Sequence, residues 1–216
     1  MGFKYNNYIF DLDGTLINSS EEVIECMYKA FIKANYPIEK STLTSDFIGP
    51  PLKQIIKNIA PELKDENKLN EILLNFRYFY DNDENDISKI YTGVYDVLNK
   101  LKNSGCSLFM ATFKPTIPTY RIIKQFKLNY FKDIYTIDKV EKPITKTEMI
   151  NDIIKKYKLN TNETVMIGDA QSDMIAAKEA GVKAIAALWG YGDDKTELIK
   201  NADYTIESIN EVLCLK

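Results

Sequence analysis

The sequence predicts an α/β protein in which a mostly parallel sheet is covered by helices and carries a second, helical domain as an insertion. Short β-branched or aromatic runs alternate with longer segments of helical period, which is typical of a parallel sheet with helical crossovers. Residues 18–87 differ, because they hold helical patterns and no convincing strand. The chain has 216 residues, of which 45% are hydrophobic, and this is enough for a core domain with a smaller insertion.

The strands are predicted from short apolar runs bounded by turn residues. The first of them, "NYIF", ends directly before two carboxylates. The later ones include "SLFMAT" and "TVMIG", which are apolar along their whole length, as expected of strands covered on both faces. The predicted strands lie near residues 7–11, 106–112, 133–137, 164–168, 183–188 and 203–206.

The helices of the core are predicted from apolar residues at helical spacing. The pattern over 94–104 ends at Gly105 and that over 171–180 ends at Gly181, and glycine is favoured just past a helix C-terminus. Two further patterns cover 116–127 and 146–158. The domains are therefore expected at 1–17 (first part of the core), 18–87 (helical insertion) and 88–216 (second part of the core).

The composition excludes several functions. The 28 basic and 31 acidic side chains leave a net charge of −3, which provides no broad cationic field for nucleic acid. No segment approaches the roughly 20 apolar residues of a membrane span, so we expect a cytoplasmic protein without a membrane partner. The sequence contains no histidine, which excludes Ser-His and Cys-His catalysis and most zinc chemistry. Acid–base chemistry must come from carboxylates, lysine or tyrosine.

Two carboxylates, Asp11 and Asp13, follow the first strand. Residues two apart in a strand face the same side, so they can converge at the carboxyl end of the strand, where open α/β sheets bind their ligands. Gly14 allows a tight turn and the close approach of a ligand. A calcium loop starting at Asp11 is disfavoured, because Leu16 would stand where that loop requires glycine.

A second pair of carboxylates, Asp169 and Asp173, stands where another strand gives way to a helix. Taken alone, Asp169 would be interpreted as an ordinary turn residue and Asp173 as a favourable negative charge near a helix N-terminus. Together with the first pair they suggest a hard cation such as Mg²⁺, which takes oxygen ligands. The predicted metal ligands are Asp11, Asp13, Asp169 and Asp173.

The stretches "FDLDGTL" and "IGDAQSDMIAAKEAG" resemble motifs of the haloacid dehalogenase (HAD) superfamily. With "FIGPPL", "YTGVYDVLNKLKNSG" and "WGYG", the resemblance points to the phosphoglycolate-phosphatase-like branch and spans nearly the whole chain. It implies a Rossmann-like three-layer core with an inserted helical cap. It also implies Mg²⁺, an aspartyl-phosphate formed on Asp11, and Asp13 as general acid and base.

The same resemblance assigns further site residues. Thr112 matches the second motif, whose hydroxyl binds a phosphoryl oxygen, and Lys146 matches the third-motif lysine by its spacing to the end of its helix, with Lys142 as the competing choice. Phe113 stands where that branch generally has Asn or Ser, so leaving-group recognition does not transfer from relatives. The predicted catalytic residues are Asp11, Asp13, Thr112 and Lys146, and the predicted substrate-binding residues are Gly14, Thr112, Phe113 and Lys146.

The function predicted from these residues is that of a Mg²⁺-dependent phosphatase acting on a small-metabolite phosphomonoester, phosphoglycolate-like or nucleotide-like. Two alternatives stay open: a phosphosugar mutase of the β-phosphoglucomutase type, and a module that holds or accepts phosphate without turnover. A generic aryl phosphate separates turnover from binding, and a sugar phosphate separates hydrolysis from isomerisation. The expected partner is a small phosphorylated molecule, and the chain is expected to be a monomer or a homodimer.

Overall fold

The computed structural model describes residues 3–48, 52–82, 87–139, 144–191 and 195–215. The chain divides into two compact units. The core unit combines Met1–Asn18 with Lys89–Lys216, and the inserted unit is Ser19–Ser88. The insertion predicted from the sequence, 18–87, starts and ends one residue earlier.

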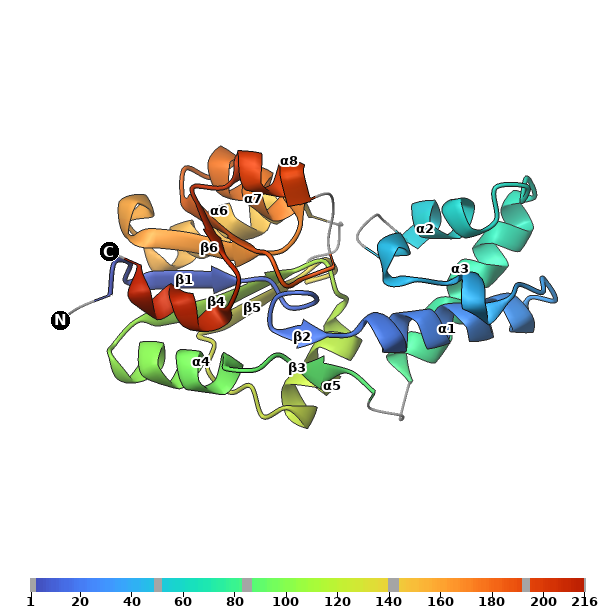
Figure 1. Ribbon diagram of the computed structural model, residues 1–216, viewed down its shortest axis with the longest axis horizontal. Helices are drawn as coiled ribbons and strands as arrows, with labels where there is room; N and C mark the ends of the chain where they lie inside the picture. The colour runs from blue at the N-terminus through green and yellow to red at the C-terminus, as the bar shows by residue number, and fades with distance from the viewer. Residues whose placement is uncertain (1–2, 49–51, 83–86, 140–143, 192–194, 216) are drawn as a thin grey trace. The chain divides into compact units, whose positions relative to one another are not determined.

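The core unit is built on a six-stranded sheet with the order β5-β4-β1-β6-β7-β8, in which neighbouring strands are parallel (Figure 1). The α/β class and the predicted parallel sheet are confirmed, and every predicted strand agrees within one residue at each end. The strand β1 lies between β4 and β6, so later strands extend the sheet on both sides of it. Strands β4 and β5 lie on one side, and β6, β7 and β8 lie on the other. The strands are β1 (Asn7–Phe10), β4 (Ser107–Thr112), β5 (Asp133–Thr136), β6 (Thr164–Gly168), β7 (Lys183–Ala187) and β8 (Tyr204–Ile206).

Helices cover both faces of this sheet, which gives the core unit three layers. Side chains alternate along each strand, so Tyr8 and Phe10 pack in one apolar cluster with α4 (Val94–Asn103) and α5 (Thr116–Gln125). Ile9 belongs to the cluster on the other face, with side chains of three further helices. These are α6 (Lys146–Tyr157), α7 (Gln171–Glu179) and α8 (Lys195–Asn201), on the opposite side of the sheet from α4 (Figure 1).

A two-stranded antiparallel ribbon stands at the boundary between the core unit and the insertion. It pairs β2 (Ile17–Asn18) with β3 (Lys89–Ile90), at the two points where the chain leaves and re-enters the core unit. The sequence did not predict these strands, because two residues are too short to show an alternating pattern. Short 3₁₀ helices at Thr161–Glu163 and Ile209–Cys214 complete the described elements of the core unit.

The inserted unit has its own apolar interior, formed by three helices: α1 (Ser20–Lys33), α2 (Leu52–Ile59) and α3 (Glu66–Asp81). Short 3₁₀ helices lie at Lys40–Thr42 and Ser45–Phe47, and the described residues of this unit contain no strand. The Asp65 side chain caps α3 by accepting a 2.8 Å hydrogen bond from Asn67 N. In the described ranges of the whole chain, no helix is long and apolar enough to cross a membrane.

Candidate active site

The candidate site lies at the carboxyl ends of the three central strands, β4, β1 and β6. Phe10, the last residue of β1, is in register with Met110 of β4 and Ile167 of β6. Thr112 and Asp169 each stand two residues beyond those partners, and Asp11 follows Phe10 directly, held by a 2.9 Å hydrogen bond from Asp11 N to Ile167 O. The sheet order therefore brings these segments to one edge, at the point where β-strand connections diverge and open α/β sheets bind ligands.

Three carboxylates gather at this edge. Asp11, Asp169 and Asp173 each offer an oxygen, and these oxygens lie within 4.8 Å of one another. All three residues are buried, with exposed fractions of 7%, 3% and 0%. Three like charges in so small a buried volume repel strongly, so the cluster needs positive charge.

Lys146 supplies one positive charge. It is the first residue of α6, whose N-terminus is fixed by a capping box between Thr145 and Glu148. Its Nζ lies 3.1 Å from Asp11 Oδ1 and also forms an ion pair with Asp173, and only 3% of the Lys146 side chain is exposed. Of the two lysines that the sequence leaves as candidates, Lys146 is the one found in the cluster, whereas Lys142 lies outside the described residues.

The pKa values of this pair reflect the environment. Burial raises the pKa of Asp11 to about 8, the carboxylates of Asp173, Asp169 and Asp13 act in the same direction, and Lys146 opposes them. For Lys146 burial acts to lower the pKa, but Asp11 and Asp173 outweigh it and raise the pKa above its ordinary value. One ammonium therefore does not offset the burial and repulsion at Asp11.

The cluster fits a further cation. Asp11 Oδ1 is buried and makes no hydrogen bond, although Lys146 Nζ is 3.1 Å away. Hard divalent cations take carboxylate oxygens as ligands. By contrast, both oxygens of Asp173 have partners, since Oδ1 pairs with Lys146 and Oδ2 accepts a 3.1 Å bond from Ala170 N. Asp11 is therefore better placed than Asp173 to hold such an ion, and Asp169 belongs to the same group of carboxylates.

Glycines make room for these carboxylates. Gly14 has a φ of +79°, and a Cβ built on it would overlap the Asp169 carboxylate. A Cβ on Gly168 would overlap Asp173 in the same way. The group that the structure places against Gly14 is a carboxylate of the site, and the predicted approach of a ligand there stays a prediction. Thr15 Oγ1, next along the chain, donates a 3.0 Å hydrogen bond to Asp169 Oδ1 and orients it.

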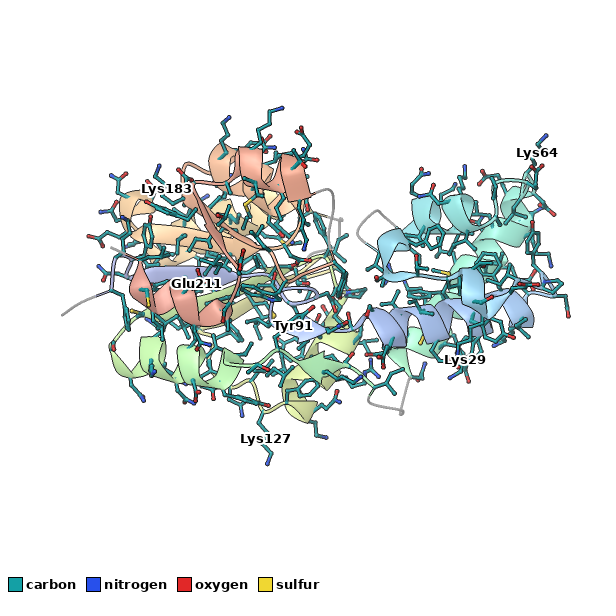
Figure 2. The ribbon with its side chains drawn as sticks, viewed as in Figure 1. Lys29, Lys64, Tyr91, Lys127, Lys183 and Glu211 are labelled. Carbon is teal, nitrogen blue, oxygen red and sulfur yellow. The ribbon has the colours of Figure 1, made fainter. Side chains whose placement is uncertain are left out.

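The Asp13 side chain has a different partner. It is not one of the three clustered carboxylates, and its predicted role as a metal ligand stays a prediction. Asp13 Oδ1 instead lies 3.1 Å from Lys114 Nζ, with 24% of the Asp13 side chain and 1% of the Lys114 side chain exposed. In the described part of the chain, Lys114 and Lys146 are the two buried lysines. Figure 2 shows other lysines, such as Lys64 and Lys127, extending away from the ribbon.

The end of β4 and the loop after it contribute two more predicted residues. Thr112 is 1% exposed, and its Oγ1 accepts a 3.1 Å hydrogen bond from Lys114 N, which leaves the hydroxyl hydrogen to be donated elsewhere. Phe113 is 40% exposed, and Lys146 Nζ lies 4.8 Å from the centroid of its ring, a cation–π contact. Lys146 thus contacts both the Phe113 ring and Asp11.

Sequence reasoning missed several residues of this site. Thr15 and Lys114 stand inside the motifs that identified their neighbours, so the signal was present but no role was assigned to them. Tyr91 was also missed (labelled in Figure 2); burial raises its pKa to about 12, with Asp169 and Asp13 acting in the same direction. Its ring packs at 6.2 Å against Trp189, whose Nε1 donates a 3.1 Å bond to Thr15 O.

A separate hollow of about 720 Å³ lies away from these residues, near the start of β7 and β8. Its lining includes Lys178 and Lys200, which stand in the last turns of α7 and α8. Lysines at that position complement the helix dipole, and the helix-end carbonyls beside them disfavour an anion. We therefore place the chemistry at the acidic cluster.

Comparisons with known proteins show which proteins this chain resembles. The sequence profile described as haloacid dehalogenase-like hydrolase matches residues 8–187. A pyrophosphatase PpaX from Anoxybacillus flavithermus is 29% identical over 212 residues, covering 97% of this chain and 96% of that protein. A pyrophosphatase PpaX from Bacillus cereus is 30% identical over 188 residues, covering 86% and 84%. The structure of a haloacid dehalogenase-like family hydrolase from Streptococcus pneumoniae superposes with a TM-score of 0.85 at 25% identity, covering 98% of both chains.

Proposed function

The chain belongs to the haloacid dehalogenase-like hydrolase family and is a phosphatase of that family, and from this premise we propose that it is a Mg²⁺-dependent enzyme acting on a small-metabolite phosphomonoester through an aspartyl-phosphate. The observation that carries the proposal is the buried cluster at the ends of β1 and β6, where Asp11 Oδ1 has no hydrogen bond and faces Lys146. A buried carboxylate that faces an ammonium is suited to attack an anionic phosphoryl group, because the ammonium offsets the negative charge that the two bring together.

The reaction has two steps. In the first, an Asp11 carboxylate oxygen attacks phosphorus in line with the leaving oxygen; the P–O bond to the leaving group breaks, and Asp13 donates a proton to the departing oxygen. In the second, water attacks the phosphorus of the aspartyl-phosphate, the P–O bond to the Asp11 carboxylate breaks, and Asp13 accepts a proton from the water. Inorganic phosphate then leaves, and both carboxyl groups return to their starting state.

The other residues bind and orient. Lys146 neutralises charge on the phosphoryl oxygens, and Asp173 holds Lys146 in place through their ion pair. The Thr112 hydroxyl donates to a phosphoryl oxygen. Asp11 and Asp169, the latter oriented by Thr15, would hold Mg²⁺. When bound, the metal supplies positive charge that offsets the repulsion between the carboxylates and the phosphate dianion.

The substrate is a small soluble phosphorylated molecule, and the relatives named pyrophosphatase make a phosphoanhydride one member of the panel to be tested. The inserted unit Ser19–Ser88 acts as the cap that selects among such molecules. A cytoplasmic location, with the chain as a monomer or homodimer, fits this function. Neither nucleic acid nor a membrane is required by it.

The test is release of inorganic phosphate from p-nitrophenyl phosphate and from a panel of phosphometabolites. We expect turnover with Mg²⁺, loss of it with a chelator and recovery on adding Mg²⁺ back. Asp11→Asn lowers kcat by at least about 10³-fold, since it removes the nucleophile. Acid-quenched wild-type protein carries the mass of one phosphoryl group that hydroxylamine removes, and Asp11→Asn does not. Wild type as inert as Asp11→Asn across the panel contradicts the proposal, and an isomerised sugar phosphate in place of phosphate indicates a mutase.

A further inference from the structure

The ion pair between Lys114 and Asp13 has no part in the reaction as described so far. Lys114 Nζ lies 3.1 Å from Asp13 Oδ1, and the lysine side chain is 1% exposed. We infer that Lys114 is a positioning residue that fixes the direction in which the Asp13 carboxylate points, so that Asp13 meets the leaving oxygen. The inference rests on the proposed function, because it concerns the proton transfer assigned to Asp13.

Lys114 is well anchored for this task. Its backbone N–H donates to Thr112 Oγ1 at 3.1 Å, and its carbonyl oxygen accepts from Thr119 Oγ1 at 3.3 Å. The loop continues into α5, where Thr116 is held by Asp138 through a 2.8 Å bond from Thr116 N and a 2.7 Å bond from Thr116 Oγ1. The base of the Lys114 side chain is thus fixed at the end of β4 and at the start of α5.

Asp13 has a backbone bridge to Ile17, but its side chain is more exposed than that of Lys114. It lies beyond the end of β1, next to Gly14, and its side chain is 24% exposed. A partly solvated carboxylate samples several rotamers, and a proton donor that is misplaced by about 1 Å can lose on the order of 10²-fold in rate. Burying an ammonium costs desolvation free energy, and a buried ion pair often adds little net stability. The Lys114–Asp13 pair is therefore better explained by a requirement of the site.

The rival explanation is that Lys114 contacts the phosphoryl group directly. The two explanations differ in how they depend on the leaving group. Phenyl phosphate and p-nitrophenyl phosphate have nearly the same shape, but the phenolate needs the proton far more than the nitrophenolate does. A positioning role through Asp13 affects phenyl phosphate more, whereas a direct phosphate contact affects both substrates equally and raises KM.

The experiment is a double-mutant cycle of Lys114→Met and Asp13→Asn, measured with both substrates and Mg²⁺. We expect Lys114→Met to lower kcat on phenyl phosphate by about 10- to 100-fold, with a several-fold smaller loss on p-nitrophenyl phosphate and little change in KM. In the Asp13→Asn background the same substitution adds less than about 2-fold, since its effect passes through Asp13. Lys156→Met, which breaks a surface pair with Asp133, is the matched control and leaves both rates unchanged.

Circular dichroism and the thermal midpoint verify that each variant is folded, and Lys114→Gln provides a second variant should Lys114→Met fail to fold. Equal losses on the two substrates, or losses that add in the double variant, overturn the inference while the phosphatase activity stands. A wild-type protein inert on both aryl phosphates and on the metabolite panel contradicts the proposed function, and the inference with it. Activity in Lys114→Met equal to wild type also overturns it.

Discussion

The two units of this chain differ in where their ion pairs lie. In the inserted unit the apolar interior also holds the buried Glu22, but ion pairs such as Lys53–Glu66 lie in water, with 51% and 58% of the two side chains exposed. In the core unit one group of ion pairs is buried: the side chains of Lys146 and its partners Asp11 and Asp173 are 3%, 9% and 0% exposed. Buried charge costs stability, and a fold that retains it at a strand edge does so for chemistry.

The largest effect is expected from removing the buried ammonium. Lys146→Met leaves Asp11 and Asp173 without their shared cation, so kcat falls by about 10²- to 10⁴-fold, as for a lost electrostatic contact to the transition state. The free energy of unfolding falls as well, by about 3 kcal/mol, as for one partner removed from a buried pair. Phosphate release and denaturant titration measure the two. Lys146→Arg, which keeps the charge, should recover most of the stability. A wild-type kcat in Lys146→Met would mean that Lys146 has no role in catalysis.

The pH dependence of stability tests the same cluster without turnover. In the metal-free protein burial raises the pKa of Asp11 from its ordinary 3.8 to about 8. Between those pH values unfolding releases a proton, so this group lowers the free energy of unfolding as pH rises, by up to about 1.4 kcal/mol per pH unit. Asp11→Asn lacks this titration.

The stability of Asp11→Asn relative to wild type should therefore increase from about pH 4 to pH 8 in chelator and level off above that range. Mg²⁺ should reduce the difference, because the cation takes the place of the proton at Asp11. Denaturant titrations across this range measure both. Parallel stability curves for the two proteins would mean that Asp11 is solvated like Glu66 of the inserted unit.

Phe113 lies between the two extremes, because it is half exposed and yet touches the buried ammonium at 4.8 Å. The cation–π contact contributes about 0.5 to 1 kcal/mol, so Phe113→Leu should lower kcat/KM on aryl phosphates by about 2- to 5-fold. Phe113→Asn, which also removes the apolar surface, should lower it further on p-nitrophenyl phosphate than on glycerol 2-phosphate. Equal effects on the two substrates would mean that the ring does not meet the leaving group.

Much of this arrangement follows from local sequence pattern. The apolar runs locate each strand of the large sheet within one residue, and the residues at or directly after the strand ends, Asp11, Thr112 and Asp169, are placed at one edge by the parallel topology. The spacing to the end of α6 selects Lys146 over Lys142. These predictions depend on strand and helix periods, which local sequence determines.

The contacts that could not be predicted from the sequence are those between distant segments, because they depend on which strands are neighbours in the sheet. Lys114 meets Asp13 across 101 positions of chain, a contact created only because β4 lies beside β1. The expectation that Asp11 and Asp13 converge assumed that the strand continues to residue 13, but β1 ends at Phe10, and Asp13 pairs with Lys114 and is not one of the three clustered carboxylates. The close fit of Gly14 against Asp169 is likewise a contact between distant segments.

The smallest effect is expected from the matched substitution in the inserted unit. Lys53 Nζ lies 2.8 Å from Glu66 Oε2 at the surface, where Lys57 also reaches Glu66 at 3.4 Å, so Lys53→Met removes one of two solvated partners. Water and Lys57 compensate, and the thermal midpoint should stay within about 1 °C of wild type. Turnover of p-nitrophenyl phosphate should also be unchanged. If Lys53→Met instead lowers kcat/KM on a phosphometabolite while its thermal midpoint is preserved, the exposed lysine contacts substrate. A solvated charge in the inserted unit would then have a function although it contributes little to stability.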